Sequence, residues 1–90
     1  MQLFDINFFR ISTTISFNVT QSSAFVTLEI FNIKGQQVKI LLNSLLSAGH
    51  YECIWSGKDN SNKSVSSGEY FARLKVNGEE IDVRKMLLLR

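Results

Sequence analysis

The sequence predicts an all-β fold, an antiparallel β-sandwich of about seven short strands. Apolar and polar residues alternate along most of the chain, as they do in strands that bury one face. β-branched and aromatic residues fill these runs, and clusters of Gly, Asn, Asp and Ser separate them every 8–12 residues or so. Ninety residues are enough for one domain with a single core.

The first two predicted strands cover residues 14–20 and 25–33, with a polar turn at 21–23 between them. In each strand every second residue is apolar, which is typical of a half-buried strand. Their inward residues are Ile15, Phe17, Val19, Val26, Leu28 and Ile30.

A tight turn at Lys34 and Gly35 predicts a hairpin from the second strand into a third at 38–42. Residues 43–49 are expected to connect this strand to a fourth at 51–55, with room for a helical turn at most. The inward residues of these two strands are Val38, Ile40, Leu42, Tyr51, Cys53 and Trp55.

Turn-forming residues dominate 56–67, with a short strand expected near Val65. The last two long strands, 68–76 and 80–89, flank Asn77-Gly78, the dipeptide favoured in type I′ hairpin turns. Inward residues of the first are Tyr70, Ala72, Leu74 and Val76. In the second, the alternation changes phase between Val83 and Met86, which suggests a bulge or a change of sheet.

The strand count, together with a bulky Trp55 in a central strand, favours a sandwich of the immunoglobulin-like type. Residues 12–90 form this predicted sandwich. Residues 1–11 are expected to be an N-terminal linker or a first edge strand.

Several motifs, taken in order, resemble those of a known family. They are STTISF (12–17), VTLEIFNIKGQ (26–36), LSAG (46–49), IW (54–55), GKDN (57–60), VSSGEYFARL (65–74) and RKMLLLR (84–90). The chain is thus similar, over about residues 7–90, to type A C-terminal sorting domains of the type IX secretion system. It is also similar to the related immunoglobulin-like domain of the flagellar hook-capping protein.

The resemblance to sorting domains implies a bacterial module that directs a parent protein through the periplasm to the cell surface or the medium. Its partner would be the secretion machinery, and no cofactor is implied. In that family the signal lies mainly in the last strands and the terminal basic residue. The matching positions here are Gly68, Tyr70, Arg73, Leu74, Lys85, Met86, Leu88 and Arg90.

The alternative function is a structural immunoglobulin-like subunit of an extracellular filament or appendage. Its neighbours would be further copies of the same domain, which makes a homo-oligomer part of this hypothesis. The apolar run 86–89 in the last strand could add to the edge of a neighbouring sheet. A carbohydrate-binding module is a third hypothesis, supported only by fold analogy.

Charge and hydropathy argue against other partners. Ten basic and eight acidic residues are dispersed along the chain, for a net charge of +2, so no basic stripe predicts nucleic-acid binding. No apolar run approaches the length of a membrane-spanning helix, so no membrane insertion is expected.

The sequence contains no constellation typical of an enzyme, so we expect no catalytic residue, cofactor or metal. His50 and Cys53 are predicted on opposite faces of their strand and cannot share a metal ion. Cys53 is interpreted as a small buried hydrophobic residue rather than a nucleophile. The oxygen-bearing run Asp59–Asn62 resembles a calcium loop but lacks the later bidentate Glu, so a plain turn is favoured over calcium.

Two aromatic residues, Phe31 and Phe71, are out of phase with the core faces of their strands. They are expected either to form an apolar docking patch on the outside of the sheet or to pack under a neighbouring loop. The sequence does not distinguish these two arrangements.

Overall fold

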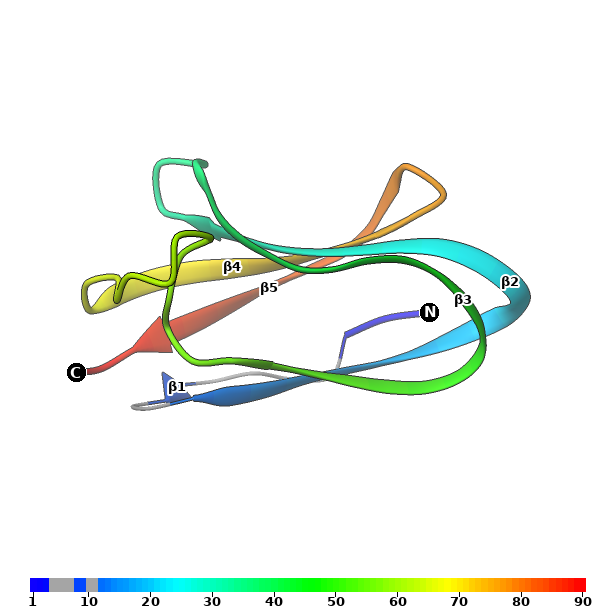
Figure 1. Cartoon of the computed structure of the whole chain (residues 1–90), viewed down its shortest axis with the longest axis horizontal. Coiled ribbons are helices and arrows are strands. Elements are labelled where there is room, and N and C mark those ends of the chain that lie inside the picture. The colour runs from blue at the N-terminus through cyan, green and yellow to red at the C-terminus, as the bar shows by residue number, and fades with distance from the viewer. Residues whose placement is uncertain (4–7, 10–11) are drawn as a thin grey trace.

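The computed structural model describes residues 1–3, 8–9 and 12–90, and its described residues form five strands in one sheet (Figure 1). The strands are β1 (Phe8–Phe9), β2 (Thr13–Asn32), β3 (Gln37–Trp55), β4 (Gly68–Val76) and β5 (Glu79–Leu88). Their order in the sheet is β1-β5-β4-β2-β3, and all pairs are antiparallel except β1 with β5. The all-β prediction is confirmed, whereas a seven-stranded sandwich is not.

Fewer strands are present because β2 and β3 are each one long strand where the sequence predicts two. They pair as a hairpin that turns a corner and runs back as a second layer (Figure 1). At the corner the pairing passes from Val19–Gly49 to Ser23–Ser47, so three residues of β2 lie against one of β3. Such a bulge bends a paired ribbon without ending it. The predicted turn at 21–23 and connection at 43–49 are therefore wrong, since both segments lie within strands.

The core lies between the two layers. Among the residues whose burial is described, fifteen apolar ones are buried there, and they follow the predicted alternation in β2 and β4. They are Leu3, Ile15, Phe17, Val19, Ala24, Val26, Leu28, Ile30, Trp55, Tyr70, Ala72, Leu74, Val76, Met86 and Leu88. Trp55 meets Tyr70 edge to face at 5.2 Å between ring centroids, and its Nε1 donates to the Lys58 carbonyl at 2.9 Å. Trp55 is thus part of the core as predicted, but its strand, β3, lies at the edge of the sheet and not at its centre.

Ile40 is one inward residue that the sequence misplaces, since 40% of it is exposed. Glu29 pairs with Ile40 while Leu28 pairs with Leu42, which leaves Leu41 as an extra residue in β3. An extra residue reverses the alternation on the bulged strand. Val38 and Leu42 remain half-buried against the core.

The change of phase predicted in β5 is also wrong. Even-numbered residues from Asp82 to Leu88 all face inward, and the bulge lies earlier, at Ile81. Asp82 and Arg84 occupy inward positions as an ion pair at 3.3 Å, and Asp82 accepts a hydrogen bond from the Leu3 amide at 3.0 Å. Charged residues on the inner face hide the alternation from a reading based on apolar residues alone.

The predicted hairpin turns are confirmed. Asn77 and Gly78 have φ angles of 53° and 82°, both positive as a type I′ turn requires. Gly35, with φ of 80°, lies in the β2–β3 turn, and its amide donates to the Asn32 carbonyl at 3.0 Å. The strand expected near Val65 does not form, and a single bridge between Lys58 and Ser64 is present instead.

Of the predicted linker or first edge strand at 1–11, the structure describes residues 1–3 and 8–9. The latter are β1, at the edge of the sheet beside Leu87 and Leu88. The described residues contain no helix with the length and hydropathy that crossing a lipid bilayer would require.

Replacing Leu74, which is fully buried at the centre of β4, should destabilise the domain strongly. We expect Leu74→Ala to lower the free energy of unfolding by about 2–5 kcal/mol, because it leaves a cavity in the core. Leu45→Ala is the control, since Leu45 is 66% exposed and its replacement should change stability by about 0.5 kcal/mol or less. Urea unfolding measures both, and equal losses would contradict the placement of the core.

Candidate functional site

The candidate site is a shallow groove on the outer face of β2, β4 and β5, with a volume of about 270 Å³. Phe31 and Phe71 lie side by side in it, because they are directly paired across β2 and β4. Both are half-buried. The groove is lined by Phe31, Asn32, Ile33, Gly35, Phe71, Arg73, Glu80 and Val83. The two phenylalanines thus contribute to an apolar surface, and the β2–β3 turn adds Ile33 to the same groove.

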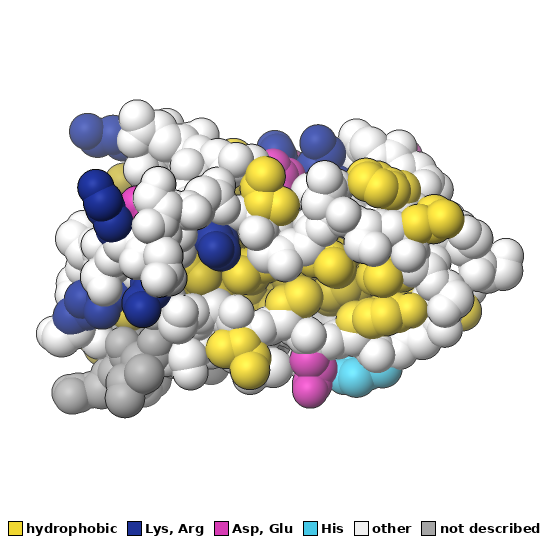
Figure 2. Space-filling view, in the orientation of Figure 1, with side chains coloured by type: hydrophobic (Ala, Val, Ile, Leu, Met, Phe, Trp, Pro, Cys, Tyr) yellow, Lys and Arg dark blue, Asp and Glu magenta, His cyan; other side chains and the backbone are white. Residues whose placement is uncertain are grey.

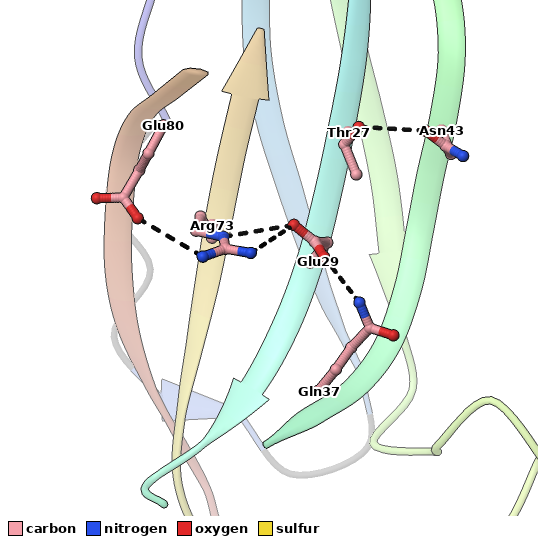
Figure 3. A network of polar contacts seen from close by, with 6 residues as sticks. All are labelled: Thr27, Glu29, Gln37, Asn43, Arg73 and Glu80. Carbon is pink, nitrogen blue, oxygen red and sulfur yellow. Dashed lines mark hydrogen bonds and ion pairs between the residues drawn. The ribbon is translucent and has the colours of Figure 1, made fainter. Parts of the chain in front are cut away.

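A polar network beside the groove fixes the position of Arg73 (Figure 3). Glu29 is only 7% exposed, although it lies on the outer face of the sheet. Its Oε1 accepts hydrogen bonds from Arg73 Nη2 at 3.0 Å and Nε at 3.3 Å, and its Oε2 accepts one from Gln37 Nε2 at 2.7 Å. The carboxylate therefore has charged and neutral donors that offset its lost hydration.

The guanidinium of Arg73 also forms part of the groove wall. It lies 4.4 Å from the centre of the Phe31 ring, within the range of a cation–π contact, and 3.9 Å from Glu80. Its charge is balanced by Glu29, so the groove presents aromatic and aliphatic surface next to a neutralised ion pair. Such a surface suits an apolar side chain of a partner better than a charged small molecule.

The sequence alone does not predict the contacts of Glu29 with Arg73 and Gln37. The only available signal is that Glu29 and Arg73 are both out of phase with the core faces of their strands. Their direct pairing depends on β4 lying next to β2, 44 residues away along the chain.

The positions matched to the sorting signal do not gather on one surface. Tyr70, Leu74, Met86 and Leu88 are buried in the core. Gly68 begins β4, and Arg73 lies in the groove network described above. Lys85 is exposed on β5, 3.8 Å from Glu69. Their role in sorting stays a prediction.

The last of these positions, Arg90, is bound to the loop at 56–67. Its Nη2 donates to the Gly57 carbonyl and its Nε to the Val65 carbonyl, both at 2.6 Å, and its amide donates to Ser67 Oγ at 2.9 Å. Gly57 has φ of 72°, and a Cβ there would lie 2.6 Å from Arg90 Nη2. A glycine at 57 thus makes room for the terminal side chain.

The run Asp59–Asn62 forms a hydrogen-bonded turn. One carboxylate oxygen of Asp59 accepts from the amides of Ser61 and Lys63, both at 2.9 Å, as in an Asx turn. The side-chain oxygen of Asn60 accepts from the Ile40 amide at 3.0 Å. These oxygens are occupied within the protein, which favours the plain turn over a calcium loop. Among the described residues, no three His, Cys, Asp or Glu side chains are grouped so that they could hold a metal ion.

His50 and Cys53 lie apart, as expected from their positions in the strand. His50 is exposed, with Nδ1 2.7 Å from Asn18 Oδ1 and Nε2 3.7 Å from Glu52. Cys53 is half-buried against the core. Burial raises the pKa of the Cys53 thiol, which lowers the fraction of reactive thiolate. Its environment therefore disfavours a nucleophilic role.

Removing the buried charge of Glu29 should destabilise the sheet. We expect Glu29→Gln to lower the free energy of unfolding by about 1–3 kcal/mol, because Arg73 loses its partner while remaining partly buried. Glu80→Gln is the matched control, since Glu80 is exposed and 3.9 Å away, and should cost about 0.5 kcal/mol or less. Unfolding in urea, at low ionic strength, measures the stability of both variants. An equal loss of stability in the two would argue against the network around Glu29.

The contact between Arg90 and Gly57 can be tested by comparing two glycines that both have positive φ. Gly57→Ala should cost more than Gly35→Ala, because only the first meets neighbouring atoms, whereas backbone strain of about 1 kcal/mol is common to both. In an Arg90→Ala background the difference should shrink, as measured by thermal unfolding. If the difference between the two glycine variants stays the same without Arg90, the contact between Arg90 and Gly57 is absent.

Comparison with known proteins identifies relatives of this arrangement. Residues 6–80 match the family model of the FlgD Ig-like domain. No curated protein sequence matches the chain. The solved structure of FLGD from P. aeruginosa is 25% identical, with a TM-score of 0.61, over 82% of this chain and 58% of that one.

A second solved structure shares the fold alone. It is the alkylpurine DNA glycosylase AlkC from Pseudomonas fluorescens, bound to DNA with an abasic site analog, at 15% identity and a TM-score of 0.56. The alignment covers 99% of this chain and 30% of that one. Since the family model spans most of the sequence, and a FLGD structure shares both fold and residues, the chain belongs to the family of FlgD Ig-like domains, the hook-capping group of the predicted resemblance.

Proposed function

We propose that this chain is a non-catalytic structural module of a bacterial flagellar hook-capping assembly, acting outside the cell through protein contacts. The family match over residues 6–80 is the observation that carries the proposal, and the FLGD structure supports it. The chain spans 58% of that FLGD chain, so the activity of a whole capping protein enters here only as part of the proposal.

The groove on the outer sheet face is the surface that we assign to these contacts. Ile33 is 69% exposed at its rim, next to the half-buried Phe31 and Phe71. A partner that inserts an apolar side chain there would remove this surface from water without having to neutralise an uncompensated charge, because Arg73 is already paired. The proposal therefore predicts a protein partner, not a cofactor or nucleic acid.

A sorting role in type IX secretion is the second candidate, supported by the sequence resemblance over residues 7–90. With Met86 and Leu88 in the core and Arg90 bound to the 56–67 loop, a receptor would have to recognise the folded surface around Lys85 and Arg90.

Deletion of the gene in the organism that encodes it tests the leading proposal. We expect hooks and filaments to be lost or malformed under electron microscopy, and the unaltered gene to restore them. Normal hooks with a secreted protein retained in the periplasm would instead favour the sorting role.

Two variants, each introduced into the deletion strain, test the groove. The two replaced residues are equally exposed, and only one of them lies in the groove. Ile33→Asp places a charge in the apolar groove and should fail to restore hooks, whereas Ile54→Asp, at 68% exposure on the other layer, should restore them. Urea unfolding of both proteins checks that each is folded. Equal complementation by the two variants would remove the groove from the proposal.

A further inference from the structure

The outer side of β3 is a free edge of the sheet. β3 is the last strand in the sheet order, and no strand within residues 1–3, 8–9 and 12–90 pairs with its far side. Within residues 42–47, the backbone N–H and C=O groups that point away from β2 have no strand partner in the described part of the chain, so another strand could pair with them. An edge of this kind normally carries charges or prolines that prevent such pairing.

The middle of this edge has neither of those protections. Residues 40–49, with the sequence ILLNSLLSAG, include no charged residue and no proline. The two ends differ from this middle. At one end Asn60 donates to the Val38 carbonyl and accepts from the Ile40 amide, both at 3.0 Å. At the other end lie His50 and Glu52, 3.7 Å apart. The unprotected interval therefore runs from Leu42 to Ser47, between the bulge at Leu41 and the corner that begins at Ser47.

The core is also incompletely covered along β3. Figure 2 shows hydrophobic side chains gathered along the middle of the face that it presents, and Figure 1, in the same orientation, shows β3 on this face. The half-buried hydrophobic residues of β3 that pack against the core are Val38, Leu41, Leu42, Leu46, Tyr51 and Cys53. A strand added to this edge would shield them from water as well as satisfy the backbone groups.

We propose that two copies of this chain pair through their β3 edges, antiparallel about a two-fold axis near Ser44. Such an interface requires a segment that is complementary to itself. Leu42, Ser44 and Leu46 are paired with the buried Leu28, Val26 and Ala24, so they face the inner side. A two-fold axis at Ser44 places Leu42 of each copy opposite Leu46 of the other copy.

Charge is compatible with this pairing. Residues 42–47 contain no charged residue, and the nearest cation, Lys39, lies beyond the bulge at Leu41, so no two like charges face each other across the new edge. The outer edge of β5 is a poorer occupant. Its sequence carries charged residues at Glu79, Glu80, Asp82, Arg84 and Lys85, which would meet leucines on β3. Its end is already paired with β1.

The strand-addition hypothesis drawn from the sequence thus moves from the last strand to β3. Met86 and Leu88 of the apolar run are buried in the core of their own domain, and β5 is paired with β4 along its length. Self-association at β3 stands or falls independently of the proposed flagellar role, because it concerns the isolated chain.

Sedimentation velocity over micromolar to millimolar concentrations tests the proposal. We expect a monomer–dimer equilibrium that Leu45→Lys weakens at least about tenfold, because a lysine in an edge strand opposes pairing. Ile54→Lys is the control, at similar exposure on the same strand beyond the interval, and should dimerise like the unaltered chain. A monomer at every concentration would overturn the proposal, as would a dimer that Leu45→Lys leaves unchanged.

A cysteine placed at the proposed axis tests the register. Ser44→Cys should form a disulfide-linked dimer under mild oxidation, whereas the unaltered chain, which retains Cys53, should not. Hydrogen exchange should also slow at 42–47 as concentration rises, and remain unchanged at the β5 edge. A dimer that neither cross-links nor protects 42–47 would place the interface elsewhere and refute pairing at β3.

Discussion

The corner in the β2–β3 hairpin is the constraint on which the rest of the structure depends. Because the same two strands supply part of both layers, the core can close only if the hairpin bends between Val19 and Ser23. The bulge there lets the paired ribbon change direction while its hydrogen bonds resume on either side. Leu3 also reaches the second layer, where it forms an isolated bridge with Phe17 of β2. β3 is the last strand in the sheet order, so its outer edge has no strand partner within the described residues.

On the outer face of the sheet, Arg73 stabilises the buried carboxylate of Glu29. A carboxylate in the middle of a four-stranded face loses most of its hydration when long side chains cover it. Arg73 and Gln37 replace that hydration with three hydrogen bonds, and the same guanidinium is then held over the Phe31 ring. The result is a groove whose shape is set by a fixed ion pair. In other proteins, replacing a buried ion pair by apolar residues is often neutral for stability. We therefore explain the Glu29–Arg73 pair by the position that it gives the Arg73 guanidinium, and not by a gain in stability.

The sequence predicts the faces of the strands better than their limits. Burial alternates as expected from Ile15 to Val19 and from Tyr70 to Val76, because those residues line the core. The predicted strand limits are wrong where residues are polar for a reason other than lying in a turn. Residues 21–23 are polar because they lie at an exposed corner. Asp82 can face inward because Arg84 balances its charge and the Leu3 amide donates a hydrogen bond to it. The groove depends on strand order, which no local pattern contains.

The two surfaces lie on different parts of the molecule, and this bears on how they could be used together. The groove is formed by β2, β4, β5 and the β2–β3 turn, whereas the open edge is the far side of β3. Pairing at β3 would therefore extend the sheet without covering either groove. A two-fold pair would carry two apolar grooves on the outer faces of one continuous sheet, each with its own neutralised ion pair. A module of this kind would bind two partner subunits at once, which a single immunoglobulin-like domain with one groove does not do.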